Sequence, residues 1–123
     1  ILELEPENMV ALNNLAWLYH EQGNSKAIEL SRKAYELKPK QPEIVDTYGW
    51  ILVNQGSGAE GLAVLQGALV LSPDHPEIAY HVGYSLHKAG RSKEAKRILQ
   101  RVVRDHAESP FATQAEQLLG QIE

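Results

Sequence analysis

The sequence predicts an all-α solenoid made of three helical hairpins and a final capping helix. Two observations predict this fold. The first is a repeat of 33 or 34 residues in the positions of proline, glycine and aromatic residues. The second is an apolar pattern with the period of an α-helix, which recurs in each repeat.

The repeat is visible in four sets of equivalent positions. These sets are Pro6, Pro39 and Pro73; Gly23, Gly56 and Gly90; Pro42, Pro76 and Pro110; and Trp17, Trp50 and Tyr84. Intervals of 33 residues arise because the turn after Gly23 is one residue shorter than the turn after Gly56. The repeat therefore has one unit length, with a single deletion in the first turn.

The first unit is predicted to contain two helices. Its first helix spans about residues 8–22, with Leu12, Leu15, Ala16 and Tyr19 at the i, i+3, i+4, i+7 spacing of one apolar face. Gly23 is expected to stop this helix, and a second helix from about residue 25 ends before Pro39.

The next two units follow the same plan. Their helices are expected at about residues 42–55, 59–71, 76–89 and 92–105. Pro42 and Pro76 suit a first helical turn because the missing N–H has no partner there, and Glu43 and Glu77 favour the positive end of the helix dipole.

The two ends depart from the repeat. After Pro110 an apolar stripe continues with a polar outer side, which predicts a helix that covers the last apolar face. Residues 1–6 are interpreted as the end of a second helix from a preceding repeat. Such an end leaves an apolar face on the first repeat through which the chain could associate with itself.

Small and large residues alternate at fixed repeat positions. Large–small pairs occur at Leu15-Ala16, Tyr48-Gly49 and Val82-Gly83, and small residues occur in the second helices at Ala27, Gly61 and Ala95. With the 34-residue period, this pattern resembles the tetratricopeptide (TPR) repeat. The resemblance implies a right-handed superhelix with repeats at 7–39, 40–73 and 74–107 and a capping helix at 108–123.

Composition and motifs argue against catalysis. Apolar residues make up 43% of the 123 residues and charged residues 23%, as in ordinary globular proteins. The chain has no cysteine, no glycine-rich phosphate loop, no nucleophile elbow and no metalloprotease motif. No apolar run is long enough to cross a bilayer. We therefore expect neither an enzyme nor a cofactor nor membrane insertion.

The five histidines do not predict a metal site. His81 and His87 are six residues apart on one expected helix and so point in different directions. His20 and His87 occupy the same position of different repeats, which separates them along the solenoid. Histidines of the surface or of the groove, without a metal ion, are the expected interpretation.

The TPR resemblance implies a binding groove. In this family the first helix of each repeat lines the concave face, and the equivalent groove positions are Asn13, Asn14, Trp17, His20, Asp46, Thr47, Trp50, Tyr80, His81, Tyr84 and His87. The aromatic row of Trp17, Trp50 and Tyr84 has two interpretations. The rings pack between repeats, or they stack on a bound peptide or sugar, and both can hold at once.

One type of TPR partner is disfavoured. TPR domains that grip the terminal carboxylates of heat-shock chaperones use lysine and arginine in the groove. This sequence has Asn13, Asp46 and Glu77 at the corresponding places.

Basic residues gather near the C-terminus, although the net charge is −4. Arg97, Arg101 and Arg104 share one face at i, i+4 and i+7 of the third repeat's second helix, which is the convex side in this family. The default interpretation is a solvated surface. The alternative is a site for an anionic partner such as an acidic polysaccharide, lipid headgroups or nucleic acid. Nucleic acid is disfavoured because no aromatic residues are interleaved with these bases.

The sequence thus predicts a non-catalytic scaffold that binds a protein or peptide partner in its groove. Binding of an anionic polymer and structural self-association are the alternatives. The strings around Trp17, Trp50 and Tyr84 also resemble the last repeats of bacterial TPR proteins linked to exopolysaccharide export and PEP-CTERM protein sorting. This resemblance implies an envelope-associated, periplasmic setting.

Overall fold

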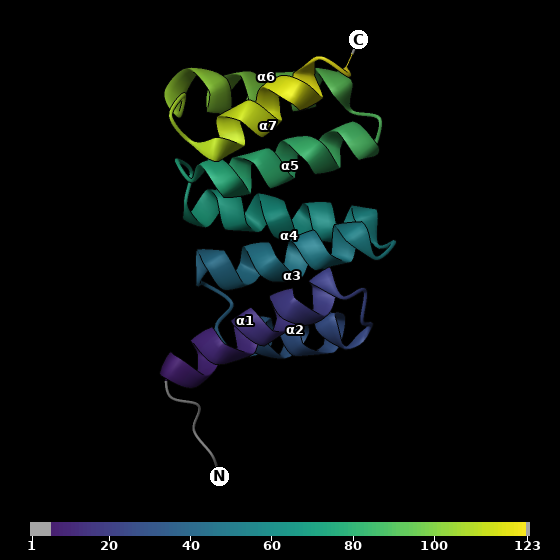
Figure 1. Cartoon of the computed structure of the whole chain (residues 1–123), viewed down its shortest axis with the longest axis vertical. Helices are drawn as coiled ribbons and strands as arrows, with labels where there is room; N and C mark the ends of the chain where they lie inside the picture. Colours follow the sequence, from purple (N-terminus) through teal and green to yellow (C-terminus); the bar gives the residue numbers. More distant parts are fainter. Residues whose placement is uncertain (1–5, 123) are drawn as a thin grey trace.

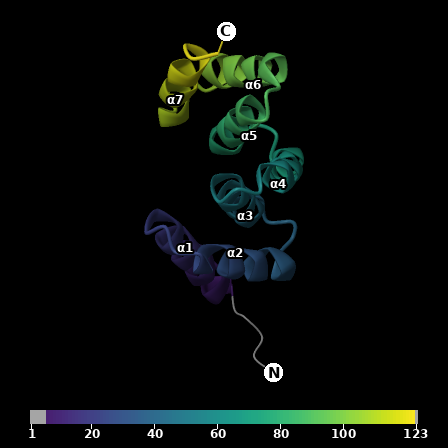
Figure 2. The same ribbon diagram turned by 90° about the vertical axis from the view of Figure 1, so that its right-hand side faces the viewer.

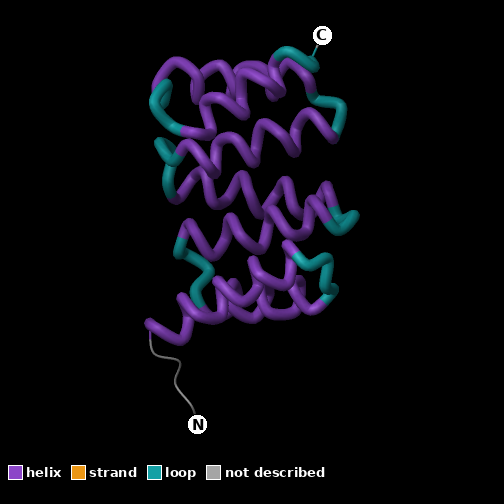
Figure 3. The backbone as a smooth tube through the Cα atoms, viewed as in Figure 1, coloured by secondary structure: helices purple, strands orange, loops and turns teal. Residues whose placement is uncertain are grey.

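The structure is a computed structural model that describes residues 6–122, with side chains from residue 11 onward. Seven α-helices occupy this part of the chain, and it contains no strand, as the sequence predicted (Figure 1, Figure 3). The segment interpreted as the end of a preceding repeat lies outside the described residues, apart from Pro6. This proline is the first residue of the first helix rather than the last residue of an earlier one.

The helices alternate with short turns along the whole described chain. They are α1 (Pro6–Glu21), α2 (Lys26–Leu37), α3 (Pro42–Asn54), α4 (Gly58–Leu71), α5 (Pro76–Lys88), α6 (Ser92–Asp105) and α7 (Pro110–Leu119). The predicted bounds of the first six helices differ from these by two residues at most. Proline begins α1, α3, α5 and α7, where its missing N–H and fixed φ favour a first turn.

One glycine ends the first helix of each hairpin. Gly23, Gly56 and Gly90 have φ angles of 71°, 97° and 81°, and no other described residue has a positive φ. An L side chain is strained in this left-handed region, whereas glycine is not. The predicted stop at Gly23 is confirmed.

The helices form two layers. In Figure 2, α1, α3, α5 and α7 lie on one side of the array and α4 and α6 on the other, with α1 and α7 projecting beyond α3 and α5. The side formed by these four helices is therefore concave. The largest apolar cluster lies at the C-terminal end, where Ala112, Ala115 and Leu118 of α7 pack against α5 and α6.

Glycines allow the helices of the second hairpin to approach closely. A Cβ atom added to Gly61 would lie 2.7 Å from the carbonyl oxygen of Gly49 and 2.6 Å from Cγ2 of Val53. These separations are too short for any larger residue. The small positions in α3 and α4 thus set the distance between the two helices.

The first helix is less covered than its equivalents. Leu15 and Leu18 are 39% and 50% exposed, although Leu15 was expected on the apolar face. The equivalent Tyr48 and Ile51 of α3 are 4% and 0% exposed. Tyr48 is buried because the preceding second helix, α2, stacks Tyr35 on it with a centroid distance of 5.0 Å. Within residues 6–122, α1 packs only on α2 and α3, so it has no such cover.

No helix in the described part of the chain has both the length and the apolar character needed to span a membrane.

Candidate binding surface on the concave side

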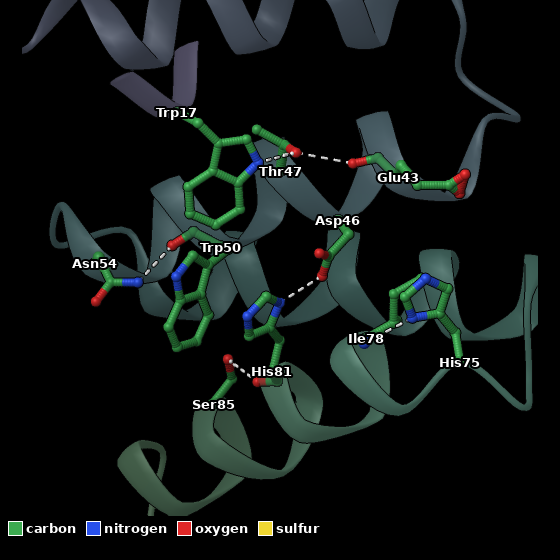
Figure 4. A network of polar contacts seen from close by, with 10 residues as sticks. All are labelled: Trp17, Glu43, Asp46, Thr47, Trp50, Asn54, His75, Ile78, His81 and Ser85. Atoms are coloured by element: carbon green, nitrogen blue, oxygen red, sulfur yellow. Dashed lines mark hydrogen bonds and ion pairs between the residues drawn. The ribbon is translucent and has the colours of Figure 1, made fainter. Parts of the chain in front are cut away.

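The first helices bring the three aromatic residues of the row together on the concave side. Trp17 of α1, Trp50 of α3 and Tyr84 of α5 are each partly buried. Each tryptophan contacts the next first helix (Figure 4). The indole Nε1–H of Trp17 donates a 2.8 Å hydrogen bond to Oγ1 of Thr47, and Trp50 stacks on His81 with ring centroids 4.0 Å apart. The rings therefore join successive repeats and keep part of their surface exposed.

Thr47 links the first two repeats through its hydroxyl group. The hydroxyl accepts the hydrogen bond from Trp17 and donates one of 2.9 Å to the backbone carbonyl of Glu43, one turn earlier in α3. Thr47 is 1% exposed. Its side chain is satisfied within the protein and offers no free group to a partner.

His81 links the second and third repeats and is held by an acid. Its Nδ1 donates a 2.7 Å hydrogen bond to Oδ1 of Asp46, and the two residues are 3% and 4% exposed. Because a buried carboxylate needs a donor, this contact offsets the cost of burying Asp46. Trp50 covers the flat face of the imidazole and fixes its plane.

The predicted groove set needs a correction at three positions. Asp46, Thr47 and His81 were expected to line the groove, but their side chains are buried between first helices. The reason is that each first helix packs directly on the next, so that the residues at the contact are covered. These residues position the aromatic row.

The C-terminal part of the surface holds an aromatic cluster. Tyr80 lies 6.4 Å from Tyr84 and 6.1 Å from Phe111 of α7, measured between ring centroids, and Tyr84 meets the edge of Trp50 at 5.0 Å. Phe111 was not among the predicted groove residues, because it belongs to the apolar stripe that follows Pro110. Its position directly after Pro110, which begins α7, is the sequence feature that could have indicated its place beside the groove.

The other predicted groove residues are more scattered. Asn14 is exposed, whereas Asn13 and His87 are partly buried. The buried Oδ1 of Asn13 and Nδ1 of His87 have no hydrogen-bond partner among the described residues. His20 meets the edge of Trp17 at 5.8 Å, and burial lowers the pKa of its imidazole. His20 therefore extends the aromatic row at the N-terminal end, while His87 lies near its other end.

Comparison with known families identifies the repeat. A family profile described as tetratricopeptide repeat matches residues 52–122, and a second profile with the same description matches residues 1–29. The chain belongs to the tetratricopeptide repeat family.

Known proteins are similar to this chain in sequence or in fold. The TPR repeat-containing protein PA4667 of Pseudomonas aeruginosa is 37% identical over 71 residues, which cover 56% of this chain and 12% of that protein. The chain thus matches only a small part of its relative. The translocator chaperone SycD of Yersinia enterocolitica has a TM-score of 0.85 at 17% identity, over 96% of this chain and 92% of SycD. The first TPR domain of Spaghetti (RPAP3), solved with an HSP90 peptide, has a TM-score of 0.81 at 17% identity, over 98% and 97%.

Acidic residues border the aromatic row of this TPR chain. Glu77, in the first turn of α5, is partly buried, and burial raises the pKa of its carboxyl group. Nearby His81 opposes this rise, and nearby Asp46 adds to it. Burial likewise raises the pKa of Tyr80. The border of the concave surface near Glu77 is therefore acidic and only partly solvated.

One group of side chains has the composition of a cation site. Asp46, Glu77 and His81 offer ligand atoms that lie within 4.8 Å of one another. Two ligands of one tetrahedral zinc ion would lie about 3.3 Å apart, given zinc–ligand distances near 2 Å. The 2.7 Å between Asp46 and His81 is shorter and fits a direct hydrogen bond. A metal ion bound by both residues would have to break the hydrogen bond between Asp46 and His81. The spacing between histidines does not reveal this mixed group, because its three members come from two different helices.

The basic patch lies away from this surface. Arg97, Arg101 and Arg104 are exposed on α6, in the opposite layer (Figure 2). Arg104 pairs with Asp105 at 3.0 Å, whereas Arg97 and Arg101 form no ion pair with a described residue. The patch is therefore a second surface feature that the concave site does not use.

Proposed function

We propose that this TPR chain is a non-catalytic scaffold that holds a peptide segment of a protein partner against its concave side. The observation that carries the proposal is the row of Trp17, Trp50 and Tyr84, which are partly exposed and held in place by neighbouring helices. Aromatic side chains supply a large contact area, and little rotamer entropy is lost on binding when they are already fixed.

The spacing of the row sets a requirement on the partner. The ring centroids of Trp50 and Tyr84 lie 5.0 Å apart, and an extended peptide advances about 3.3 Å per residue. A peptide that passes from α3 to α5 would therefore meet these two rings with side chains two residues apart, which lie on one face of an extended chain. We expect a partner segment with apolar side chains at that interval.

Proteins of similar fold support a peptide partner. SycD has been solved in complex with a peptide of the translocator YopD, and the RPAP3 domain with an HSP90 peptide. The concave side of this chain has Glu43 and Glu77 at its border and Asp46 beneath it, so an acidic terminal peptide would meet charges of its own sign. The partner of this chain is therefore expected to be neutral or basic at that border.

We also propose a bacterial envelope or export setting, with a periplasmic location. This part of the proposal is supported by two observations. The sequence segments around Trp17, Trp50 and Tyr84 resemble the last repeats of bacterial TPR proteins linked to exopolysaccharide export, and one relative of the chain is bacterial. Binding of a polysaccharide or self-association through α1 would be the function if no peptide binds the concave side.

The test uses a peptide selected against the chain from a displayed random library, with its affinity measured by fluorescence anisotropy. Trp50→Ala should weaken binding by about tenfold or more, as expected for an aromatic at the centre of an interface. Tyr35→Ala is the matched control, because Tyr35 is also a partly buried, stacked aromatic but belongs to α2. Its affinity should stay within about twofold of the parent.

Circular dichroism must show that both variants remain helical. If Trp50→Ala is folded and binds as tightly as the parent, or if Tyr35→Ala weakens binding equally, the aromatic row is not the binding site.

A further inference from the structure

The second helices carry three outward positions that can be compared from repeat to repeat. These positions, all exposed, are Glu29, Lys33 and Glu36 in α2; Ala63, Gly67 and Val70 in α4; and Arg97, Arg101 and Arg104 in α6. We call them the outer row of each helix. The outer row is charged in α2 and α6 and entirely uncharged in α4.

The whole outer side of α4 shares this character. Glu60 is the one charged residue in its 14-residue sequence. Val70 is 79% exposed and Leu71 is 41% exposed. The outer side of a helix in contact with water ordinarily carries charged and polar residues, as α2 and α6 do. An outer side without them is typical of a helix that another molecule covers.

A groove lies beside the outer row of α4. A groove of about 530 Å³ lies between α4 and α6, with Leu69, Val70 and Pro73 on one wall and Ile98 on the other. Ala63 and Gly67 are small, so the surface of α4 is recessed at these two positions. A Cβ atom added to Gly67 would meet nothing within 4 Å. The backbone of a docked helix can approach closely over such residues.

The charges around the groove select the partner. Glu94 of α6 lines the groove, but both of its carboxylate oxygens accept hydrogen bonds from Arg91. Arg97 and Arg101 of α6 are exposed and form no ion pair with a described residue. Arg101 also lines an adjoining cavity together with Asp74 and Asp105, and Asp105 is paired with Arg104. Asp74 also forms no ion pair with a described residue, so the unpaired charges here are two bases and one acid, and positive charge prevails on the α6 side. A segment that fills this groove would place apolar residues on α4 and carboxylates beside the two arginines.

We propose that the surface between α4 and α6 docks an amphipathic, acidic helix of a protein partner. This surface is separate from the concave side, so the proposal does not depend on the aromatic row. The shape favours a helix over an anionic membrane. Membrane-binding surfaces present large protruding apolar and aromatic side chains, whereas the outer row of α4 is recessed at two of its three positions.

The probe is a synthetic amphipathic helix of about 18 residues with a leucine stripe flanked by glutamates. Its counterpart has the same stripe flanked by lysines. Binding to the whole chain is measured by fluorescence anisotropy at low and high salt. The acidic helix should bind at least about tenfold more tightly than the basic one, and salt should reduce this difference.

Two variants locate the binding. The row exchange Ala63→Glu/Gly67→Lys/Val70→Glu gives α4 the outer row of α2 and should weaken the acidic helix by about tenfold or more. Arg97→Glu/Arg101→Glu should remove or invert the preference between the two peptides. Glu29→Ala, an equivalent outward position on α2, is the control and should leave binding unchanged.

Several results would overturn the proposal. They are equal binding of the acidic and basic helices, binding unaffected by the row exchange, and a preference for vesicles of anionic lipid over the acidic helix. A dimer in sedimentation velocity that the row exchange dissociates would show that a second copy of the chain covers this surface instead.

Discussion

The first and second hairpins have different small residues in the interface between their two helices. In the first, Ala16 and Ala27 lie together in the interface between α1 and α2. In the second, Gly49 and Gly61 occupy the equivalent positions, and backbone atoms of α3 and α4 come close enough to exclude a Cβ atom at Gly61. The second hairpin is therefore the more tightly packed of the two.

The same two repeats also differ in how they hold the next first helix. Trp17 of the first repeat relies on a hydrogen bond to Thr47. At the equivalent contact, Trp50 of the second repeat stacks on His81, which in turn is bonded to the buried Asp46. One repeat geometry thus accepts either a neutral hydrogen bond or a stacked ring with a buried acid. The contact between the second and third repeats therefore depends more on an ionisable pair, Asp46 and His81.

Removing the buried acid should show this difference most strongly. Asp46→Ala leaves Nδ1 of His81 buried without an acceptor, and we expect it to lower the free energy of unfolding by about 3 kcal/mol. Thr47→Val removes the acceptor of the half-buried Trp17 and should cost only about 1 kcal/mol. Urea unfolding followed by circular dichroism measures both. Equal losses would mean that the two contacts contribute alike despite their different chemistry.

The glycine pair gives the next largest effect. Gly61→Ala forces two backbone segments apart at a cost of about 3 kcal/mol, and the better helix propensity of alanine returns about 1 kcal/mol, so a net loss of about 2 kcal/mol is expected. Gly67→Ala in the same helix is the control. Its added Cβ meets nothing, and it should stabilise the protein by up to about 1 kcal/mol. If Gly61→Ala is also stabilising, the close approach of α3 and α4 is not required.

The architecture could be predicted from the sequence because short-range signals determine it. Proline at the start of a helix and glycine after its end act within one turn, and Gly23 and Pro42 marked boundaries to within two residues. Small residues such as Gly61 indicated where helices approach. Helical periodicity and turn chemistry were therefore sufficient for the fold.

The site could be predicted only in outline. Periodicity assigned Asp46 and His81 to the first helices, but it does not encode which side chains meet between one repeat and the next. Leu15 shows the same limit, since its exposure depends on what packs on α1 rather than on its position in the repeat. The uncharged outer row of α4 is visible when the second helices are aligned, whereas the clustering of positive charge indicates only Arg97, Arg101 and Arg104.

The smallest expected effect concerns the acid beside the second contact. Burial raises the pKa of Glu77, with His81 opposing and Asp46 adding to the rise. The folded state therefore binds this proton more tightly than the unfolded state. Its contribution to stability is present below the unfolded pKa and is lost as pH rises through the folded pKa. At neutral pH the ionised Glu77 opposes folding.

Glu77→Gln should consequently raise the free energy of unfolding at pH 7 by about 0.5 kcal/mol, and the difference from the parent should shrink towards zero near pH 4. Glu43 occupies the equivalent position of α3 and is exposed, so it is the matched control. Glu43→Gln removes a favourable charge at a helix N-terminus without relieving burial, and it should be slightly less stable than the parent at pH 7. Urea unfolding at the two pH values distinguishes these outcomes. A loss of stability in both variants would mean that the helix dipole outweighs burial at Glu77, and the two repeats would then be alike at this position.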